Sequence, residues 1–584
     1  MNVLQYSRLK QQLIVGCVIV CCAIANALFF FGPVIPILGQ HAQSRLGIFY
    51  EAFFHTSNPE IIFGEGTDPL GSFWIVTKVR HMLTGQSDSF LSDIYAPYGF
   101  DIGKHEGFAW GDTILSIPWE ILIGTPGFYN LHLFQTLCLS FIGCAYLARA
   151  AGAKIVPSLL IAHIATIHNF SITEMSLGRP TQVYWLFQCI FVIGVLNILK
   201  GKHPRFWSVI AGISFAWSCL VYWFGAVAIG FCVMLLFFAQ GFVQGKYRNT
   251  LIYGSIIAVL SIAITFAVTA RVSLPILLGT DHSYASFSNP PEMYLNALFF
   301  YIPLINIQDI FETKQVFLLL QQSGISFHLW ILSGIVFAFG IWDHRSRWWA
   351  CLSLFAATIT FGSAIRIGGI IIPTAYAFIQ TVFPPLIRCT DANRMMNASV
   401  LCCVVAFSML LRHKKGFQRL LLYVFLGSLV FFNIQYFPKE AVQATRNIYI
   451  KEQLHAFIAQ QEGGLIHVPL IRMEEEYVEQ LWHGQSVFGG QGMYLLRSDA
   501  HKEYEKNNLF LSELLSFDEA STSKISYRQE NIQQLIADGF LYIVFHKTSL
   551  QRPMRDYIDA LQIRGTDIEK DQVYVISLQQ LLSK

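Results

Sequence analysis

Charged residues are scarce in this sequence of 584 residues. Asp, Glu, Lys and Arg make up 13% of it, roughly half the share found in typical soluble proteins, whereas hydrophobic residues make up 54%. So many apolar side chains exceed what a soluble core can bury, and we expect most of the chain to lie in a lipid bilayer. The net charge of +3 is too small to indicate a nucleic-acid partner.

The sequence also lacks the spacings that mark several classes of site. Of the 12 cysteines, all but Cys389 lie in apolar runs, and none has the spacing of a metal ligand set or a disulfide framework. There is no GxxxxGK[ST] loop to bind a nucleotide phosphate. The first apolar run, 12–38, is too long for the core of a signal peptide and has no A-x-A cleavage site, so it predicts a retained membrane anchor.

Apolar runs of membrane-spanning length recur along the first three quarters of the chain. A helix needs about 20 mostly apolar residues to cross the hydrocarbon, and this length predicts about eleven transmembrane helices. The predicted spans are 12–38, 127–148, 154–170, 180–199, 205–223, 224–241, 250–273, 327–342, 347–363, 395–411 and 417–436. The chain is therefore predicted to be a polytopic α-helical membrane protein.

Basic residues gather in every second connection between these spans. Lys and Arg accumulate in short cytoplasmic loops, so this alternation places the N-terminus inside. The basic connections contain Arg8 and Lys10, Arg149 and Lys154, and the stretches 200–205, 245–248, 343–347 and 412–419. The loops 39–126 and 274–326, the stretch 364–394 and the tail then fall on the outer face, where we expect chemistry or recognition.

The chain changes character after residue 436. Charges become frequent, and strand-like runs alternate with helical ones, which predicts a soluble α/β domain at 437–584 outside a membrane domain at 1–436. The predicted strands are 465–471, 540–546 and 573–578, and the predicted helices are 447–461 and 528–539. Within the loop 39–126, the stretches 68–83 and 112–124 are too polar or too short to cross, and they predict helices lying in the membrane interface.

Two acids, Glu65 and Asp68, lie among glycines where the first external loop turns back towards the bilayer. Glycine lets a backbone approach a ligand closely, so these carboxylates are candidate catalytic groups. Asp68-Pro69 is equally typical of a helix start, with Asp as the N-cap and Pro at the first helical position. The turn-rich stretch 92–108 adds Asp101 and His105 as candidate binding residues, although solvent-exposed loops commonly carry such side chains.

Arginines form a third group of candidates on the outer face. An arginine near hydrocarbon needs an anionic partner, which can be a carboxylate, a phosphate or a lipid headgroup. Snorkelling to headgroups or an internal pair with an acid would also explain them. The group comprises Arg179 in a short external turn, Arg366, and Arg388, Asp391 and Arg394 in the IRCTDANR stretch before the tenth span.

Carboxylates and arginines at a membrane surface suggest one chemistry. The arginines would bind a lipid-linked phosphate bidentately, and a carboxylate would act as general base on an acceptor hydroxyl that attacks the anomeric carbon of a sugar. The phosphate leaves, so stabilising its charge lowers the barrier. Such a donor needs no nucleotide site.

With these features the sequence resembles the GT-C glycosyltransferases, membrane-embedded enzymes that use polyprenyl-phosphate sugars. The resemblance rests on the acidic pair at 65 and 68, on PYGFD (97–101) before GTPGFYNLHLF (124–134), on the arginine pair of IRCTDANR, and on the tail. In the tail the matching stretches are HVPL (467–470), WHGQSVFGG (482–490), DGFLYIVFH (538–546) and VYVISL (573–578). In these stretches the sequence resembles bacterial members that have an extracytoplasmic C-terminal domain.

The resemblance implies a function and a location. Asp68 or Glu65 would be the catalytic base, and the protein would transfer a hexose or pentose from a polyprenyl-phosphate donor to a glycan, lipid or protein acceptor. It would lie in a bacterial inner membrane, with its C-terminal domain in the periplasm or outside the cell. The two acids are three residues apart and do not form an acid-x-acid pair, which leaves dependence on a divalent cation such as Mg or Mn open and no metal ligand assigned.

Two other classes of function remain open from the sequence. A flippase or transporter of lipid-linked glycans would carry acids or broken helices at mid-membrane, often in repeated halves, and the spans show few charges and no repeat. A non-catalytic assembly or scaffold protein would use the tail as its working part.

Overall fold

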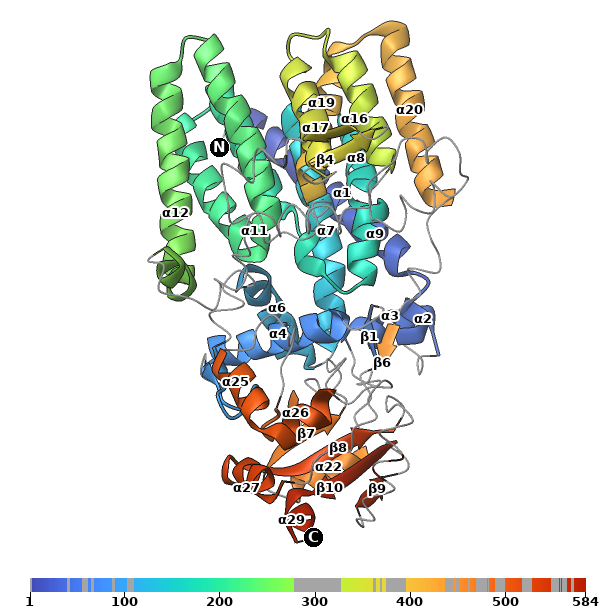
Figure 1. The fold of residues 1–584 in the computed structure, drawn as a ribbon. Coiled ribbons are helices and arrows are strands. Elements are labelled where there is room, and N and C mark those ends of the chain that lie inside the picture. The colour runs from blue at the N-terminus through green and yellow to red at the C-terminus, as the bar shows by residue number, and fades with distance from the viewer. Residues whose placement is uncertain are drawn as a thin grey trace. The chain divides into compact units, whose positions relative to one another are not determined.

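The computed structural model is mostly helical, with a few short sheets (Figure 1). It describes residues 3–38, 43–54, 61–64, 68–86, 90–101, 110–125, 127–277, 327–360, 364–367, 370–373, 376, 395–435, 445–447, 452–460, 463–468, 480–481, 483–488, 499–516, 528–547, 556, 558, 565–568 and 572–583. The chain divides into two compact units, the first made of 1–57, 108–270 and 287–445 and the second of 58–107, 271–286 and 446–584.

The first unit is a bundle of apolar helices. Its helices are α1 (Val3–Phe31), α2 (Ile35–Leu38), α3 (Arg45–Phe54), α6 (Trp110–Ile123), α7 (Gly127–Ala151), α8 (Ile155–Thr166), α9 (Asn169–Ser176), η1 (Pro180–Gln182), α10 (Leu186–Leu199), α11 (Pro204–Val243), α12 (Tyr247–Leu277), α16 (Phe327–Gly340), α17 (Arg347–Ile359), α19 (Met396–His413) and α20 (Gly416–Gln435). A hairpin of β4 (Ala364–Ile367) and β5 (Ile370–Pro373) completes it.

A helix lies at each of the spans that the sequence predicted. Among the described residues, six helices are long and apolar enough to cross a membrane, or seven if the bent pair α8 and α9 forms one span. The protein is therefore an integral membrane protein, while the total of about eleven spans and the inside position of the N-terminus stay predictions.

The central helices of this unit differ from the peripheral ones in burial. Within its most apolar window α19 is 83% buried, and it packs against α7, α8, α11, α16 and α17. The corresponding window of α12 is only 17% buried and exposes large apolar side chains such as Leu251, Val259 and Ile262. Because exposed apolar surface of this extent is stable only in lipid, α12 lies at the lipid-facing edge of the unit.

The 40-residue helix α11 is two rods that meet at Tyr222. Tyr222 has non-helical backbone angles, φ −155° and ψ 94°. A Cβ on Gly230 would clash with the ring of Phe215, although a straight helix would hold these residues roughly 20 Å apart. The helix therefore folds back on itself at Tyr222, which agrees with the two separate spans predicted at 205–223 and 224–241.

The second unit combines the C-terminal tail with part of the first external loop. Its elements are β1 (Ile61–Phe63), α4 (Asp68–Leu83), β2 (Phe90–Leu91), β3 (Phe100–Asp101), β6 (Thr445–Asn447), α22 (Glu452–Ala459), β7 (Gly464–Val468), α25 (Asp499–Asn507), α26 (Leu509–Ser516), α27 (Gln529–Ala537), β8 (Phe540–His546), β9 (Thr566–Ile568), β10 (Val573–Ser577) and α29 (Leu578–Leu582). The three strands and the two helices that the sequence predicted in the tail are confirmed as β7, β8, β10, α22 and α27.

The core of this unit is a four-stranded sheet in the order β7-β8-β10-β9. β7 pairs parallel to β8, whereas β10 pairs antiparallel to both β8 and β9. Every residue of β7 is buried, as expected for a strand covered on both faces. α27 and α29 pack against β8 and against each other.

The loop segment is joined to the tail by backbone and side-chain contacts. The Val487 amide donates to the Asp93 carbonyl at 2.8 Å, and the Ala96 amide donates to the Val487 carbonyl at 3.1 Å. The Asp93 carboxylate accepts from Lys78 Nζ at 3.0 Å and from Gln480 Nε2. Residues 58–107 thus group with the tail, although they lie far from it in the sequence.

Candidate functional site: a buried acid and histidine beside the kink of α11

For most of the candidate residues that the sequence singled out, the side chain lies outside the part of the chain that the structure describes. Of their backbone, Asp68 is the first residue of α4, Asp101 ends β3, and Arg366 lies on β4 opposite Ile371. The start of α4 at Asp68 agrees with the helix-start interpretation of Asp68-Pro69. Glu65, His105, Arg388, Asp391 and Arg394 lie outside the described residues, and the roles of this whole group stay predictions.

Arg179 is the predicted site residue whose side chain is described. Its Nη1 lies 3.3 Å from Glu174 Oε2, and its amide donates to the Glu174 carbonyl at 2.8 Å. Gly178, at φ +64°, closes the turn between them, and its carbonyl accepts a 2.8 Å hydrogen bond from the Tyr129 hydroxyl. Glu174 is buried, so the internal pairing left open by the sequence is present here, and the arginine is held in one place.

Helix α6 is amphipathic, and it buries its polar face and exposes its apolar face. Its buried residues are Gly111, Asp112, Thr113, Ser116 and Glu120. Ile121 and Leu122, by contrast, are 78% and 73% exposed. A helix on a soluble protein buries its apolar stripe, so this orientation indicates that lipid or headgroups contact the outside of α6 while its polar face points into the protein.

The polar face of α6 presents Asp112 to His132 on α7. His132 Nε2 lies 3.7 Å from Asp112 Oδ2, and the two side chains are 0% and 1% exposed. Neither carboxylate oxygen and neither ring nitrogen has a hydrogen-bond partner among the described residues. Burial raises the pKa of the Asp112 carboxyl, and His132 and the nearby backbone amides of Asp112 and Thr113 oppose this rise without cancelling it. At 3.7 Å the imidazole is beyond ordinary hydrogen-bond length and acts through its charge.

Aromatic side chains from α11, from α10 and from Tyr184 just before α10 lie near the start of α6. A Cβ on Gly111 would lie 3.1 Å from Trp217 Nε1 and 2.7 Å from Val221, so only glycine lets α6 approach α11 this closely, just before the kink. The ring of Phe187 lies 5.2 Å from that of Trp217 and 5.9 Å from that of Tyr184. Tyr184 lies close enough to Asp112 for the carboxylate charge to interact electrostatically with the phenol. Tyr184 Oη and Trp217 Nε1 are buried without a described hydrogen-bond partner.

Asn397, on α19, fixes the second rod of α11 just beyond the kink. Its Nδ2 donates to Gln188 Oε1 at 2.5 Å and to the Gly225 carbonyl at 3.0 Å. Asn397 is almost fully buried, so the NAS sequon at 397–399 is not accessible for glycosylation in this fold. Three helices are thus tied together next to the site.

The sequence did not single out Asp112, His132 or Trp217. Two signals could have found them. The residues Asp112, Ser116 and Glu120 recur every fourth position and so form one polar stripe on a short apolar helix. His132 is an ionisable residue at the start of an apolar span, and such residues mark functional sites by default.

The described residues do not fit a resident metal ion. They bring together no group of three or more His, Cys, Asp and Glu side chains that could hold one, and the pair of Asp112 and His132 offers too few ligands for a stable site. We therefore derive no step through Mg or Mn.

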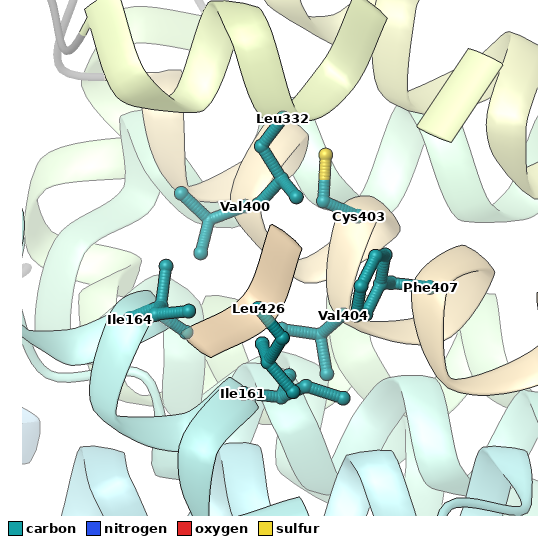
Figure 2. A pocket seen from close by; sticks show the side chains of 9 residues that line it. Ile161, Ile164, Leu332, Val400, Cys403, Val404, Phe407 and Leu426 are labelled. Atoms are coloured by element: carbon teal, nitrogen blue, oxygen red, sulfur yellow. The ribbon is translucent and has the colours of Figure 1, made fainter. Parts of the chain in front are cut away.

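An apolar pocket between α8, α16, α19 and α20 is too small to be the functional site (Figure 2). It is lined by Ile161, Ile164, Ala165, Leu332, Val400, Cys403, Val404, Phe407 and Leu426. Its cavity volume of about 20 Å³ is enough for about one water molecule and not for a sugar.

The fold of this chain is similar to that of several solved structures. The chain is similar to the Archaeoglobus fulgidus oligosaccharyltransferase in complex with Zn and sulfate, with a TM-score of 0.52, 11% identity, and coverage of 90% of this chain and 68% of that one. The apo form of that protein gives a TM-score of 0.52 at 10% identity, with 90% and 69% covered. A structure of the arabinofuranosyltransferase AftD from Mycobacteria gives 0.49 at 10% identity, with 91% and 35% covered.

At these identities the likeness concerns the fold. The chain has a GT-C-like fold, as the sequence predicted, and the proteins it is similar to are GT-C glycosyltransferases. Scans against models of protein families and against curated proteins found no match.

Proposed function

We propose that the protein is an integral membrane glycosyltransferase. It moves a sugar from a polyprenyl-phosphate donor to a glycan, lipid or protein acceptor on the outer face of a bacterial inner membrane. The observation that supports this proposal most is the extent of the fold likeness, which covers 90% of the chain at a TM-score of 0.52. The tail forms the extracytoplasmic domain in this proposal.

The proposed reaction is a displacement at the anomeric carbon. Asp68 or Glu65 removes the proton from an acceptor hydroxyl, whose oxygen forms the new glycosidic bond while the bond between the anomeric carbon and the phosphate oxygen breaks. The lipid phosphate leaves with the electron pair. Arginines stabilise its charge, with Arg179 as the first candidate because Glu174 fixes its position. Arg366, Arg388 and Arg394 are the further candidates.

The polar interior beside α11 favours this proposal over a scaffold role. A buried carboxyl and a buried imidazole that face each other at 3.7 Å, without a hydrogen bond of ordinary length, cost stability. A protein that only joins other proteins through its tail has no use for such groups in its membrane unit, whereas an enzyme does.

The test is sugar transfer by the purified protein in lipid nanodiscs, with polyprenyl-phosphate-linked hexoses and pentoses as donors. We expect Asp68→Asn or Glu65→Gln to lower the transfer rate by about 10² to 10⁴ at unchanged melting temperature, which is the usual contribution of a general base. Asp567→Asn, at an exposed pair with Lys547, is the matched control and should keep full activity. Full transfer by both catalytic variants would refute the base assignment, and no transfer from any donor by the unaltered protein would refute the function.

A further inference from the structure

We propose that Asp112, His132, Tyr184 and Trp217 form a subsite that binds the hydroxyl groups of a sugar ring. This proposal deepens the glycosyltransferase function and rests on it. It assigns a role to residues of the membrane unit that neither the sequence motifs nor the proposed reaction uses.

The first step is the number of buried polar atoms near the start of α6 that have no described hydrogen-bond partner. Both carboxylate oxygens of Asp112, both ring nitrogens of His132, the Tyr184 hydroxyl and Trp217 Nε1 are buried without a described hydrogen-bond partner. Leaving such a group unsatisfied costs about 1 to 3 kcal/mol, and native proteins rarely tolerate several side by side. A ligand that hydrogen-bonds to them removes this cost.

The second step is the chemistry of that ligand. The cluster contains acceptors on Asp112, a donor on Trp217 and groups on Tyr184 and His132 that can do both. Hydroxyl groups match this mixture because each donates and accepts. The aromatic wall of Tyr184, Phe187 and Trp217 suits the apolar C–H face of a sugar ring.

The third step excludes other ligands. Among the described residues, no Lys or Arg side chain acts on the Asp112 carboxyl. A phosphate would therefore face a carboxyl with no guanidinium to balance it. A metal ion would find two protein ligands, as described above. A lipid tail would leave every one of these polar atoms unsatisfied.

The fourth step does not depend on the polar atoms that lack hydrogen-bond partners. Helix α6 turns its polar face inward and its apolar face outward, and Gly111 lets the start of this helix pack directly against Trp217. The N-terminal part of α6 is thus built to bring Asp112 into the interior of the unit. A helix that only covered the membrane surface would not need a buried acid.

The experiment compares binding of polyprenyl phosphate with and without an attached monosaccharide to the full-length protein in nanodiscs. We expect the unaltered protein to bind the sugar-carrying lipid more tightly, and Asp112→Asn and Tyr184→Phe to lower that preference about tenfold, as the loss of one strong hydrogen bond predicts. Binding of the bare lipid should change less than about twofold. A second arm titrates soluble oligosaccharides, which distinguishes an acceptor sugar from the donor sugar.

Ser218→Ala is the matched control, because Ser218 is buried next to Trp217 but its hydroxyl donates within its own helix, to the Ser214 carbonyl at 2.8 Å. It should leave both affinities unchanged. The subsite would be overturned, and the proposed function left in place, if Asp112→Asn and Tyr184→Phe kept both the preference for the sugar-carrying lipid and the affinity for soluble oligosaccharides. Equal weakening of both lipids would also overturn it, since that result indicates a structural role. No sugar preference and no transfer in the unaltered protein would overturn the proposed function as well.

Discussion

Replacing Asp112 by asparagine should stabilise the protein, and the gain should grow with pH. The carboxyl is buried, its oxygens have no hydrogen bond of ordinary length to another described side chain, and His132 Nε2 lies 3.7 Å away, so burial dominates and raises its pKa. A raised pKa means that the folded state binds the proton more tightly than the unfolded state does. The folded state is therefore favoured at low pH and loses stability as pH rises from the ordinary aspartate value towards the raised pKa.

The size of the effect follows from what the substitution removes. Asparagine keeps the shape of the side chain and cannot ionise, so the buried charge disappears while an unpaired polar group remains. The desolvation penalty of one such group is about 1 to 3 kcal/mol, and we expect a gain in that range above the raised pKa and almost none near pH 4. In a unit of this size the melting temperature should rise by a few degrees.

The assay is thermal unfolding in nanodiscs from about pH 4 to 8, with the melting temperatures of variant and unaltered protein compared at each pH. Asp93→Asn is the control of opposite sign, because Asp93 accepts from Lys78 Nζ at 3.0 Å and from Gln480. That variant should lose about 1 kcal/mol at neutral pH. A destabilised Asp112→Asn at every pH, or a difference that does not change with pH, would refute the reasoning.

Three further predictions concern the contacts around the site and in α4. Asn397→Ala should destabilise the protein by about 1 to 2 kcal/mol through the loss of two interhelical hydrogen bonds, whereas Ser408→Ala, which loses a bond within its own helix, should cost less when both are unfolded side by side. Burial, helped by neighbouring cations, lowers the pKa of His81 to about 4, so stability should fall as pH drops from about 6.5 to 4; His81→Gln should flatten a stability profile over that range by up to about 1 kcal/mol, since the ring is only partly buried. Glu174→Gln should leave Arg179 without its anion and lower the melting temperature by an amount worth about 1 to 2 kcal/mol, an effect that added salt should not rescue because Glu174 is buried.

Much of the fold could be predicted from the sequence because membrane helices follow a local rule. Length and apolarity predicted a helix at every position where the structure has a long one, and short strand-like runs predicted β7, β8 and β10. The grouping of residues 58–107 with the tail could not be predicted, because it depends on contacts such as that of Asp93 with Gln480, which lie far apart in the chain.

The candidate site was harder to predict for a related reason. The sequence drew attention to acids and arginines in loops, where glycine and proline make them visible. Asp112 lies in a short apolar stretch that predicts an interfacial helix. The sequence alone does not determine which face of that helix points into the protein. The sequence predicted a break between the two spans at 205–223 and 224–241, but not that Trp217, just before this break, would lie next to Gly111 of α6.

The orientation of α6 also bears on the order in which the protein is assembled. The ribosome completes α6 before α7 and long before α11, so its hydrophilic side has no protein to cover it when it leaves the translocation machinery. It must stay in water or among headgroups until those later helices arrive. Biogenesis intermediates truncated before residue 204 should therefore leave this segment open to protease, and full-length chains should protect it.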